Sequence, residues 1–173
     1  MVNPYSGALK ASRILLNILL FINVGTGVML ILAVPASFLF EPQFFAFFSK
    51  RQPSIDPGWL LPALRLWMVF ALVMVAAAQV LFSRLLDVVG TVGAGDPFVP
   101  ENAARLMTIA WCALAIQVLQ LVFGVMAATV NAAGSNVEWE FSLNGWLAVV
   151  LLFVLANVFE AGTRMREDLG TMI

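Results

Sequence analysis

The spacing of the charged residues constrains this chain most, because it leaves four long runs without any Lys, Arg, Asp or Glu. The runs cover residues 14–40, 66–83, 106–137 and 141–159. An α-helix needs about 20 apolar residues to cross the hydrocarbon core of a membrane, and lipid forces it to satisfy its own backbone hydrogen bonds. We therefore predict an all-α integral membrane protein, an antiparallel four-helix bundle in one domain of residues 1–173. The spans are expected at about 14–35, 62–84, 106–130 and 141–160.

The composition agrees with this interpretation and excludes several classes of protein. Hydrophobic residues make up 62% of the chain and charged residues only 11%, whereas soluble domains have about 25% charged residues. The net charge of −1 gives no basic surface for direct binding of nucleic acid. The chain has no His and one Cys, so a histidine base, a Cys/His metal site and an intrachain disulfide are excluded. We predict no cofactor and no enzymatic activity.

Lys and Arg in the short loops predict the orientation, because cytoplasmic loops carry an excess of them. Four spans place both termini on one side, together with the loop between the second and third spans. That side has six basic residues, whereas the other has three; they are Lys10, Arg13, Arg84, Arg105, Arg164 and Arg166 against Lys50, Arg51 and Arg65. Both termini are therefore expected in the cytoplasm.

The first outer connection is predicted to contain a short helix that lies in the membrane interface. Glu41 and Pro42 suit a helix start, and four phenylalanines then recur at helical spacing: Phe44, Phe45, Phe47 and Phe48. Their face would enter the acyl region and anchor the bundle. The alternative is a docking surface or lid for an apolar ligand. Three tryptophans fall near the predicted outer boundaries: Trp59, Trp139 and Trp146.

The inner loop and the C-terminal tail contain most of the remaining polar chemistry. Gly90, Gly93 and Gly95 are expected to end the second helix, and Pro100 to begin the third. These glycines lack the preceding strand and the Lys-Ser/Thr pair of a phosphate-binding loop, so we reject a nucleotide site. Local ion pairs are predicted where opposite charges lie one helical turn apart, as for Arg84 with Asp87 and for Glu160 with Arg164.

The spans contain no charged residue at depth, which argues against a proton relay or a voltage sensor. Each span instead has one uncharged polar residue at a similar shallow depth on the inner side: Asn17, Gln79, Thr108 and Asn157. Lipid cannot satisfy these groups, so we expect them to face the bundle interior. They would act as packing contacts that fix the helix register, or form a small polar pocket.

Motifs in the inner loop and the tail resemble those of a known family. The loop has Gly95-Asp96-Pro97-Phe98, then Asn102, then Arg105-Leu106; the tail has Phe159, Gly162, Met165, Glu167-Asp168 and Thr171-Met172-Ile173. Together they resemble the bacterial domain of unknown function 2975, a family of small four-span membrane proteins. This resemblance implies a multi-pass protein of the bacterial inner membrane. One departure is Gly170, where the family often has another residue.

The family has no established activity, but its genes often lie beside a small helix-turn-helix regulator. The resemblance thus implies a membrane partner or sensor for such a regulator, with a cytoplasmic docking surface formed by Gly95, Asp96, Pro97, Phe98, Asn102, Arg105, Arg164, Arg166, Glu167 and Asp168. Two alternatives stay open. One is an accessory subunit of a larger membrane complex, and the other is a binder or carrier of a lipid-like ligand.

Overall fold

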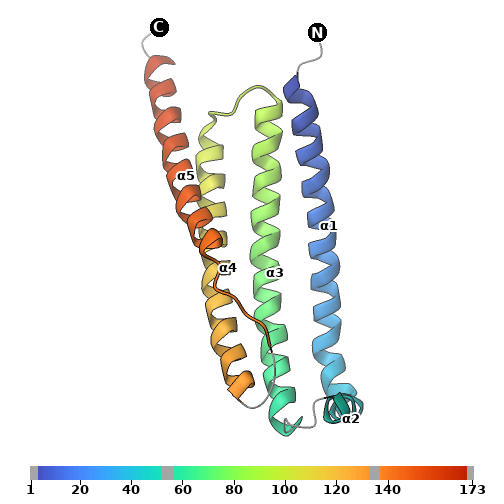
Figure 1. The fold of residues 1–173 in the computed structure, drawn as a ribbon. Coiled ribbons are helices and arrows are strands. Elements are labelled where there is room, and N and C mark those ends of the chain that lie inside the picture. The colour runs from blue at the N-terminus through green and yellow to red at the C-terminus, as the bar shows by residue number, and fades with distance from the viewer. Residues whose placement is uncertain (1–3, 52–56, 133–136, 171–173) are drawn as a thin grey trace.

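The computed structural model describes residues 4–51, 57–132 and 137–170, and these residues form five α-helices (Figure 1). They are α1 (Pro4–Leu39), α2 (Glu41–Arg51), α3 (Pro57–Gly93), α4 (Pro100–Ala132) and α5 (Leu143–Gly170). All except α2 are long and apolar enough to cross a membrane, so the all-α fold with four membrane-type helices is confirmed. α1, α3 and α4 contain 36, 37 and 33 residues, or about 50–55 Å each. Their ends therefore extend beyond a hydrocarbon core of about 30 Å.

The long helices are arranged as a row in chain order. α1 packs on α3, α3 on α4, and α4 on α5, whereas within the described residues α1 contacts neither α4 nor α5. Figure 1 shows that α1 begins and α5 ends at the same end of the molecule, where the 94–99 loop also lies. We call this the terminal end, and we call the opposite end, which carries α2, the α2 end.

The best-buried apolar cluster joins α3, α4 and α5. Its centre is formed by Leu106, Ile109 and Ala156, with partly buried side chains packed around it: Leu81, Leu85, Met107, Leu152 and Phe159. Large apolar side chains point outward along the rest of the row, as for Phe21 of α1, which is 81% exposed. In a membrane protein, such side chains contact lipid, because hydrocarbon is as apolar as they are.

α5 is shifted along α4 toward the terminal end. Gly145, near the start of α5, faces the side-chain amide of Gln117, and a Cβ added at Gly145 would overlap that amide. Gln117 lies about 22 Å before the end of α4. The preceding 137–142 segment runs along α4, where the Trp139 ring lies on Gly124 and its Nε1 donates to the Gln120 carbonyl at 3.1 Å. The fourth span thus begins beside the middle of α4, as Figure 1 shows.

The α2 end contains the short helix that the phenylalanine pattern predicted. The Phe40 carbonyl accepts hydrogen bonds from the backbone N–H groups of Gln43 and Phe44, at 3.1 and 3.0 Å, and so starts α2 directly after α1. Figure 1 shows α2 end-on, crossing the lower end of α1. The side chains of Phe45 and Phe47 are 44% and 55% exposed.

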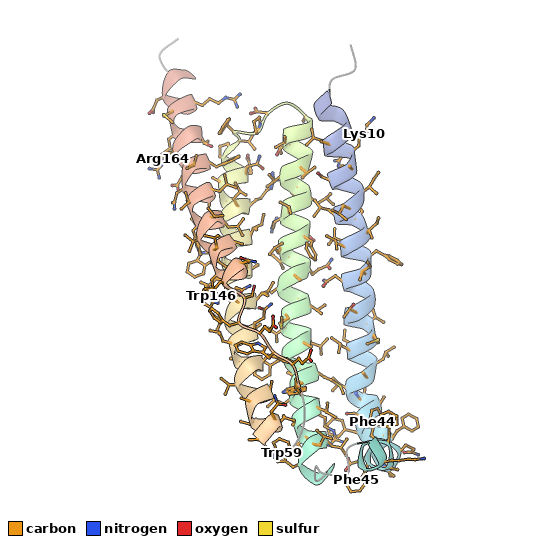
Figure 2. The ribbon with its side chains drawn as sticks, in the orientation of Figure 1. Lys10, Phe44, Phe45, Trp59, Trp146 and Arg164 are labelled. Atoms are coloured by element: carbon orange, nitrogen blue, oxygen red, sulfur yellow. The ribbon has the colours of Figure 1, made fainter. Side chains whose placement is uncertain are left out.

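Figure 2 places Phe44, Phe45 and Trp59 at the α2 end, whereas Trp146 lies near mid-height because α5 is shifted. The side chain of Phe48 lies outside the described part of the structure. The membrane-anchoring role of this phenylalanine face stays a prediction.

Candidate functional site

The 94–99 loop begins with a helix end that requires glycine. Gly95 has a φ of +91°, a left-handed conformation that side chains with a Cβ rarely adopt. Its N–H donates to the Val92 carbonyl at 3.1 Å, and the Asp96 N–H donates to the Thr91 carbonyl at 3.2 Å. This pair of bonds is the Schellman arrangement, which satisfies the last carbonyls of a helix. α3 therefore ends at a defined residue, and the loop leaves it in a fixed direction.

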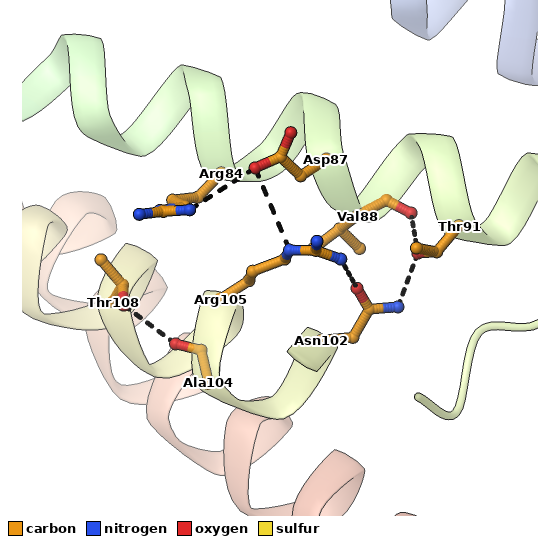
Figure 3. A network of polar contacts seen from close by, with 8 residues as sticks. All are labelled: Arg84, Asp87, Val88, Thr91, Asn102, Ala104, Arg105 and Thr108. Carbon is orange, nitrogen blue, oxygen red and sulfur yellow. Dashed lines mark hydrogen bonds and ion pairs between the residues drawn. The ribbon is translucent and has the colours of Figure 1, made fainter. Parts of the chain in front are cut away.

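Asn102 connects the end of α3, the loop and the start of α4. It is completely buried, and its Nδ2 donates to Thr91 Oγ1 at 2.7 Å and to the Pro97 carbonyl at 2.9 Å. Its Oδ1 accepts from Nη1 of Arg105 at 2.9 Å (Figure 3). Thr91 Oγ1 in turn donates to the Val88 carbonyl at 2.8 Å. The amide thus satisfies both its donors and an acceptor, as a buried polar group must.

Asp87 of α3 brings two arginines together beside Asn102 (Figure 3). Its Oδ2 lies 3.7 Å from Nη1 of Arg84 and 3.9 Å from Nε of Arg105. The predicted pair of Arg84 with Asp87 is therefore confirmed. Asp87 and Arg84 are about half exposed, and such long, exposed pairs contribute little stability. Their main consequence is to fix where the positive charge of Arg105 lies.

The tail of α5 packs against the same loop. Nη1 of Arg166 pairs with the Asp96 carboxylate and also donates to the Phe98 carbonyl at 3.3 Å. The Phe98 ring lies 5.3 Å from the Phe159 ring, measured between centroids. A Cβ added at Gly162 would lie 3.1 Å from the Phe98 ring. A glycine at this position of α5 therefore lets the aromatic side chain pack closely against the helix.

These contacts surround a hollow of about 290 Å³ between the loop and α5. It is lined by Asp96, Phe98, Val99, Pro100, Thr163 and Arg166, and we call this surface the loop–tail face. Phe98 is 42% exposed, and nearby Met165 is 62% exposed. Aromatic, methionine and arginine side chains are enriched at protein interfaces. The loop–tail face therefore offers an ion pair beside exposed apolar groups.

The other residues of the predicted docking surface lie in different places. Gly95, Pro97, Asn102 and Arg105 shape and hold the loop, and of these four only Asn102 is buried. Arg164 pairs with Glu160 of its own helix at 2.5 Å, as the spacing predicted. Asp168 is exposed.

The side chain of Glu167 lies outside the described part of the structure. The structure thus brings the predicted loop residues and Arg166 together, and a docking role for them stays a prediction.

The predicted intramembrane polar cluster needs a correction, because the structure does not bring its four residues together. Asn17, Thr108 and Asn157 each donate to the carbonyl four residues earlier in their own helix, at 2.8, 2.9 and 3.0 Å. Asn17 and Asn157 are exposed rather than directed into the interior. A short polar side chain can bond back to its own helix in this way, so it needs no partner on a neighbouring helix.

Within that set, Gln79 forms the kind of link that the sequence predicted, a side-chain hydrogen bond between two helices. Its Oε1 accepts from Nδ2 of Asn23 at 2.9 Å, and the same Nδ2 donates to the Val75 carbonyl at 3.0 Å. A Cβ at Gly27 would lie 3.2 Å from the Val75 side chain. The small residue therefore lets α1 and α3 approach closely at the point where the two amides meet.

Arg65 forms a junction that the sequence did not predict. Its Nη2 donates to the Ser37 carbonyl at 2.8 Å and to the Glu41 carboxylate at 2.6 Å. Its guanidinium carbon lies 3.8 Å from the centre of the Phe38 ring. One side chain thus joins the end of α1, the start of α2 and α3. The available signal was a lone arginine near a span boundary with two acids, Glu41 and Asp56, in the preceding connection.

Metal coordination finds no support in the part of the chain that the structure describes. Among residues 4–51, 57–132 and 137–170, no group of three or more His, Cys, Asp or Glu side chains is placed to hold an ion. Cys112 is a free, half-buried thiol. The chemistry that the terminal end offers is therefore ion pairing, hydrogen bonding and apolar contact.

Comparison with known proteins gives one finding. The family model described as protein of unknown function (DUF2975) matches residues 50–173, the region that contains the 94–99 loop, α4 and the tail of α5. No match was found among curated proteins or among solved structures.

Proposed function

The chain belongs to the DUF2975 family of unknown function, and from that premise we propose that it is a non-enzymatic membrane protein that binds a cytoplasmic partner protein through the loop–tail face. The observation that carries this proposal is the pairing of Arg166 with Asp96. It holds the tail of α5 against a loop far away in the sequence, and so builds one composite surface.

Three properties of the loop–tail face support a protein as its ligand. The loop is held from below by the buried Asn102, so its shape is set before any partner arrives. Preorganisation of this kind lowers the entropic cost of binding. Phe98 and Met165 supply exposed apolar area beside the ion pair. The hollow beside Phe98 and Arg166 would accept one inserted side chain of a partner.

The partner that we propose is a small helix-turn-helix regulator, as the family resemblance implies. A regulator held at the membrane is kept away from its DNA, and a change in the loop–tail face would release it. The chain itself would contact no nucleic acid, since its net charge is −1. With both termini in the cytoplasm, the terminal end faces the compartment in which such a regulator acts.

The proposal is tested by recovering partners from membranes in mild detergent with tagged full-length chains. We expect the wild type to recover a DNA-binding regulator, identified by mass spectrometry. Arg166→Asp and Asp96→Arg should each lose it, because like charges then face each other across the hollow. The double variant with both exchanges should regain it. Arg164→Asp is the matched control, since Arg164 pairs only inside α5. Equal recovery by all variants would remove the loop–tail face from the proposal.

A second candidate function is an accessory subunit of a larger membrane complex. The row arrangement favours it, because within the described residues α1 and α5 do not close on each other, and both flanks of α3 and α4 stay open to a neighbour. The same recovery experiment separates the two functions. A stable assembly of several membrane subunits, unaffected by the exchange of Arg166 and Asp96, would support the accessory subunit and contradict the regulator.

A further inference from the structure

The basic residues at the terminal end fall into two groups. Four are paired with a carboxylate: Arg84 and Arg105 with Asp87, Arg164 with Glu160, and Arg166 with Asp96. Lys10 and Arg13 of α1 form no ion pair with any described residue. Figure 2 shows Lys10 near the N-terminal end of α1. Among the described residues, the positive charge that remains without an ion pair at this end is therefore concentrated on α1.

Both of these residues line one hollow between α1 and α3. Its volume is about 380 Å³, within the range of about 300–1,000 Å³ that is typical of small-molecule sites. On α3 it is lined by Val89, Gly90 and Gly93. A Cβ at Gly90 would lie 3.6 Å from Nη2 of Arg13, and one at Gly93 would meet nothing within 4 Å. The lack of side chains at Gly90 and Gly93 leaves part of this space open.

The hollow lies at the depth where lipid headgroups are expected. Arg13 directly precedes the charge-free run of residues 14–40, and Asp87, the nearest acid on α3, lies about one turn before Gly90. Below this level the side chains of Ile14 and Ile18 are 62% and 50% exposed. An amphiphile with its polar group in the hollow would therefore lay its apolar chains along the exposed surface of α1.

Repulsion from the end of α3 is reduced by the way in which the helix ends. The last carbonyls of a helix carry partial negative charge and disfavour an anion. Here the carbonyls of Gly90, Thr91 and Val92 accept hydrogen bonds from the N–H groups of Ala94, Asp96 and Gly95. The Asp96 carboxylate is neutralised by Arg166. Lys10 and Arg13 therefore dominate the charge at the hollow.

We propose that this hollow binds the phosphate headgroup of an anionic phospholipid from the leaflet at the terminal end. Basic pockets between membrane-spanning helices are suited to such headgroups. The two cations would pair with the phosphate, and the glycines would let the glycerol backbone approach α3. This site is separate from the loop–tail face, because none of its lining residues belongs to that face.

The test measures binding of phosphatidylglycerol and of phosphatidylcholine with the same acyl chains to the purified full-length chain, by native mass spectrometry. We expect the wild type to prefer phosphatidylglycerol. The double variant Lys10→Gln with Arg13→Gln should lose about 25-fold in affinity for it, since each basic residue near an anionic lipid contributes about fivefold. The control double variant, Lys50→Gln with Arg164→Gln, removes equal charge elsewhere and should bind as the wild type does.

A second variant tests the hollow rather than the charge. Gly93→Leu keeps both cations and adds side-chain volume at the hollow, and its Cβ meets nothing within 4 Å. We expect it to weaken phosphatidylglycerol binding with an unchanged melting temperature in detergent. Equal affinity of the wild type for the two lipids, or unchanged binding by either hollow variant, would overturn the proposal. Displacement of the lipid by excess inorganic phosphate would overturn it in favour of a soluble anion.

Discussion

The two ends of the molecule are held together by different chemistry. At the terminal end, the contacts are polar and distributed over the Asn102 amide, the Asp87 carboxylate and the pair of Asp96 with Arg166. At the α2 end, one arginine, Arg65, forms the main polar junction. Toward this end a ring also packs on a helix surface, as for Trp139 on Gly124.

This difference indicates that the two ends have different roles: one displays a surface, and the other anchors the protein in the membrane. A network of satisfied polar groups fixes the direction of each member, so the terminal end holds its loop and charges in one arrangement. Aromatic side chains suit the boundary of a membrane, because they have a large apolar area. Tryptophan also has one polar N–H group that can form a hydrogen bond. The α2 end is therefore suited to hold the protein at its depth in the membrane, and the terminal end to display a surface to a partner.

Replacing Asn102 should have the largest effect on stability, because it removes the hydrogen bonds that join α3, the loop and α4 at the terminal end. Asn102→Ala leaves buried hydrogen-bonding groups of Thr91, Pro97 and Arg105 without the amide, and we expect a loss of about 3 kcal/mol in the free energy of unfolding. Unfolding by SDS titration, followed by circular dichroism, measures it. Asn17→Ala is the control, because Asn17 bonds only to its own helix. Equal losses in the two variants would contradict the importance of the network.

Gly124→Val tests the aromatic packing toward the α2 end. A Cβ at this position overlaps the Trp139 ring, so the ring and its hydrogen bond to Gln120 must move, at a cost of about 2 kcal/mol. The cost should nearly disappear in a Trp139→Ala background, which a double-mutant cycle of unfolding free energies detects. A cost that persists without the ring would show that the glycine is needed for another reason.

Arg65→Gln should have a smaller effect, confined to the junction of α1, α2 and α3. We expect a loss of about 1.5 kcal/mol, because hydrogen bonds from a charged group to Ser37 and Glu41 are lost in a partly buried place. Arg84→Gln, at a half-exposed pair, should change stability by less than about 0.5 kcal/mol. If the two variants behaved alike, Arg65 would be an ordinary surface arginine.

The smallest effect is expected between the two ends, at the contact of α1 with α3. Asn23→Leu removes the hydrogen bonds to Gln79 and to the Val75 carbonyl. Interhelical bonds of this type contribute about 0.6–2 kcal/mol in membranes, so a loss of about 1 kcal/mol is expected from thermal or SDS unfolding. Asn157→Leu, whose amide bonds within α5, should be neutral. A neutral Asn23→Leu would mean that helix packing alone joins α1 to α3.

Features that depend on neighbouring residues could be predicted from the sequence. The charge-free runs predicted the four long helices, and Glu41-Pro42 with the phenylalanines predicted α2. The ion pairs within α3 and within α5 followed from a separation of one helical turn. Of the three glycines expected to end the second helix, Gly95 does so with a positive φ, whereas Gly90 and Gly93 lie inside α3 and that part of the prediction was wrong. In each case a few consecutive residues decide the outcome.

Features that join distant segments were missed, and Asn102 is the clearest example. From the sequence, Asn102 was only one residue of a family motif. In the structure it is buried near the start of α4 and holds the loop by hydrogen bonds. The junction at Arg65 and the packing of Trp139 on Gly124 were missed for the same reason. Each depends on the register between two helices, which no pattern within one helix contains.

By itself, the sequence determined that this chain forms long apolar helices with its charges at their ends, because lipid excludes charge and requires satisfied backbone groups. Only the tertiary structure decided which polar residues meet. Asn17 and Asn23 both lie on α1, but six residues turn the helix so that they point about 120° apart. Asn23 faces Gln79 on α3, whereas Asn17 donates a hydrogen bond to a carbonyl of its own helix. The rotation and register of packed helices make that choice, and they are set by contacts along their whole length.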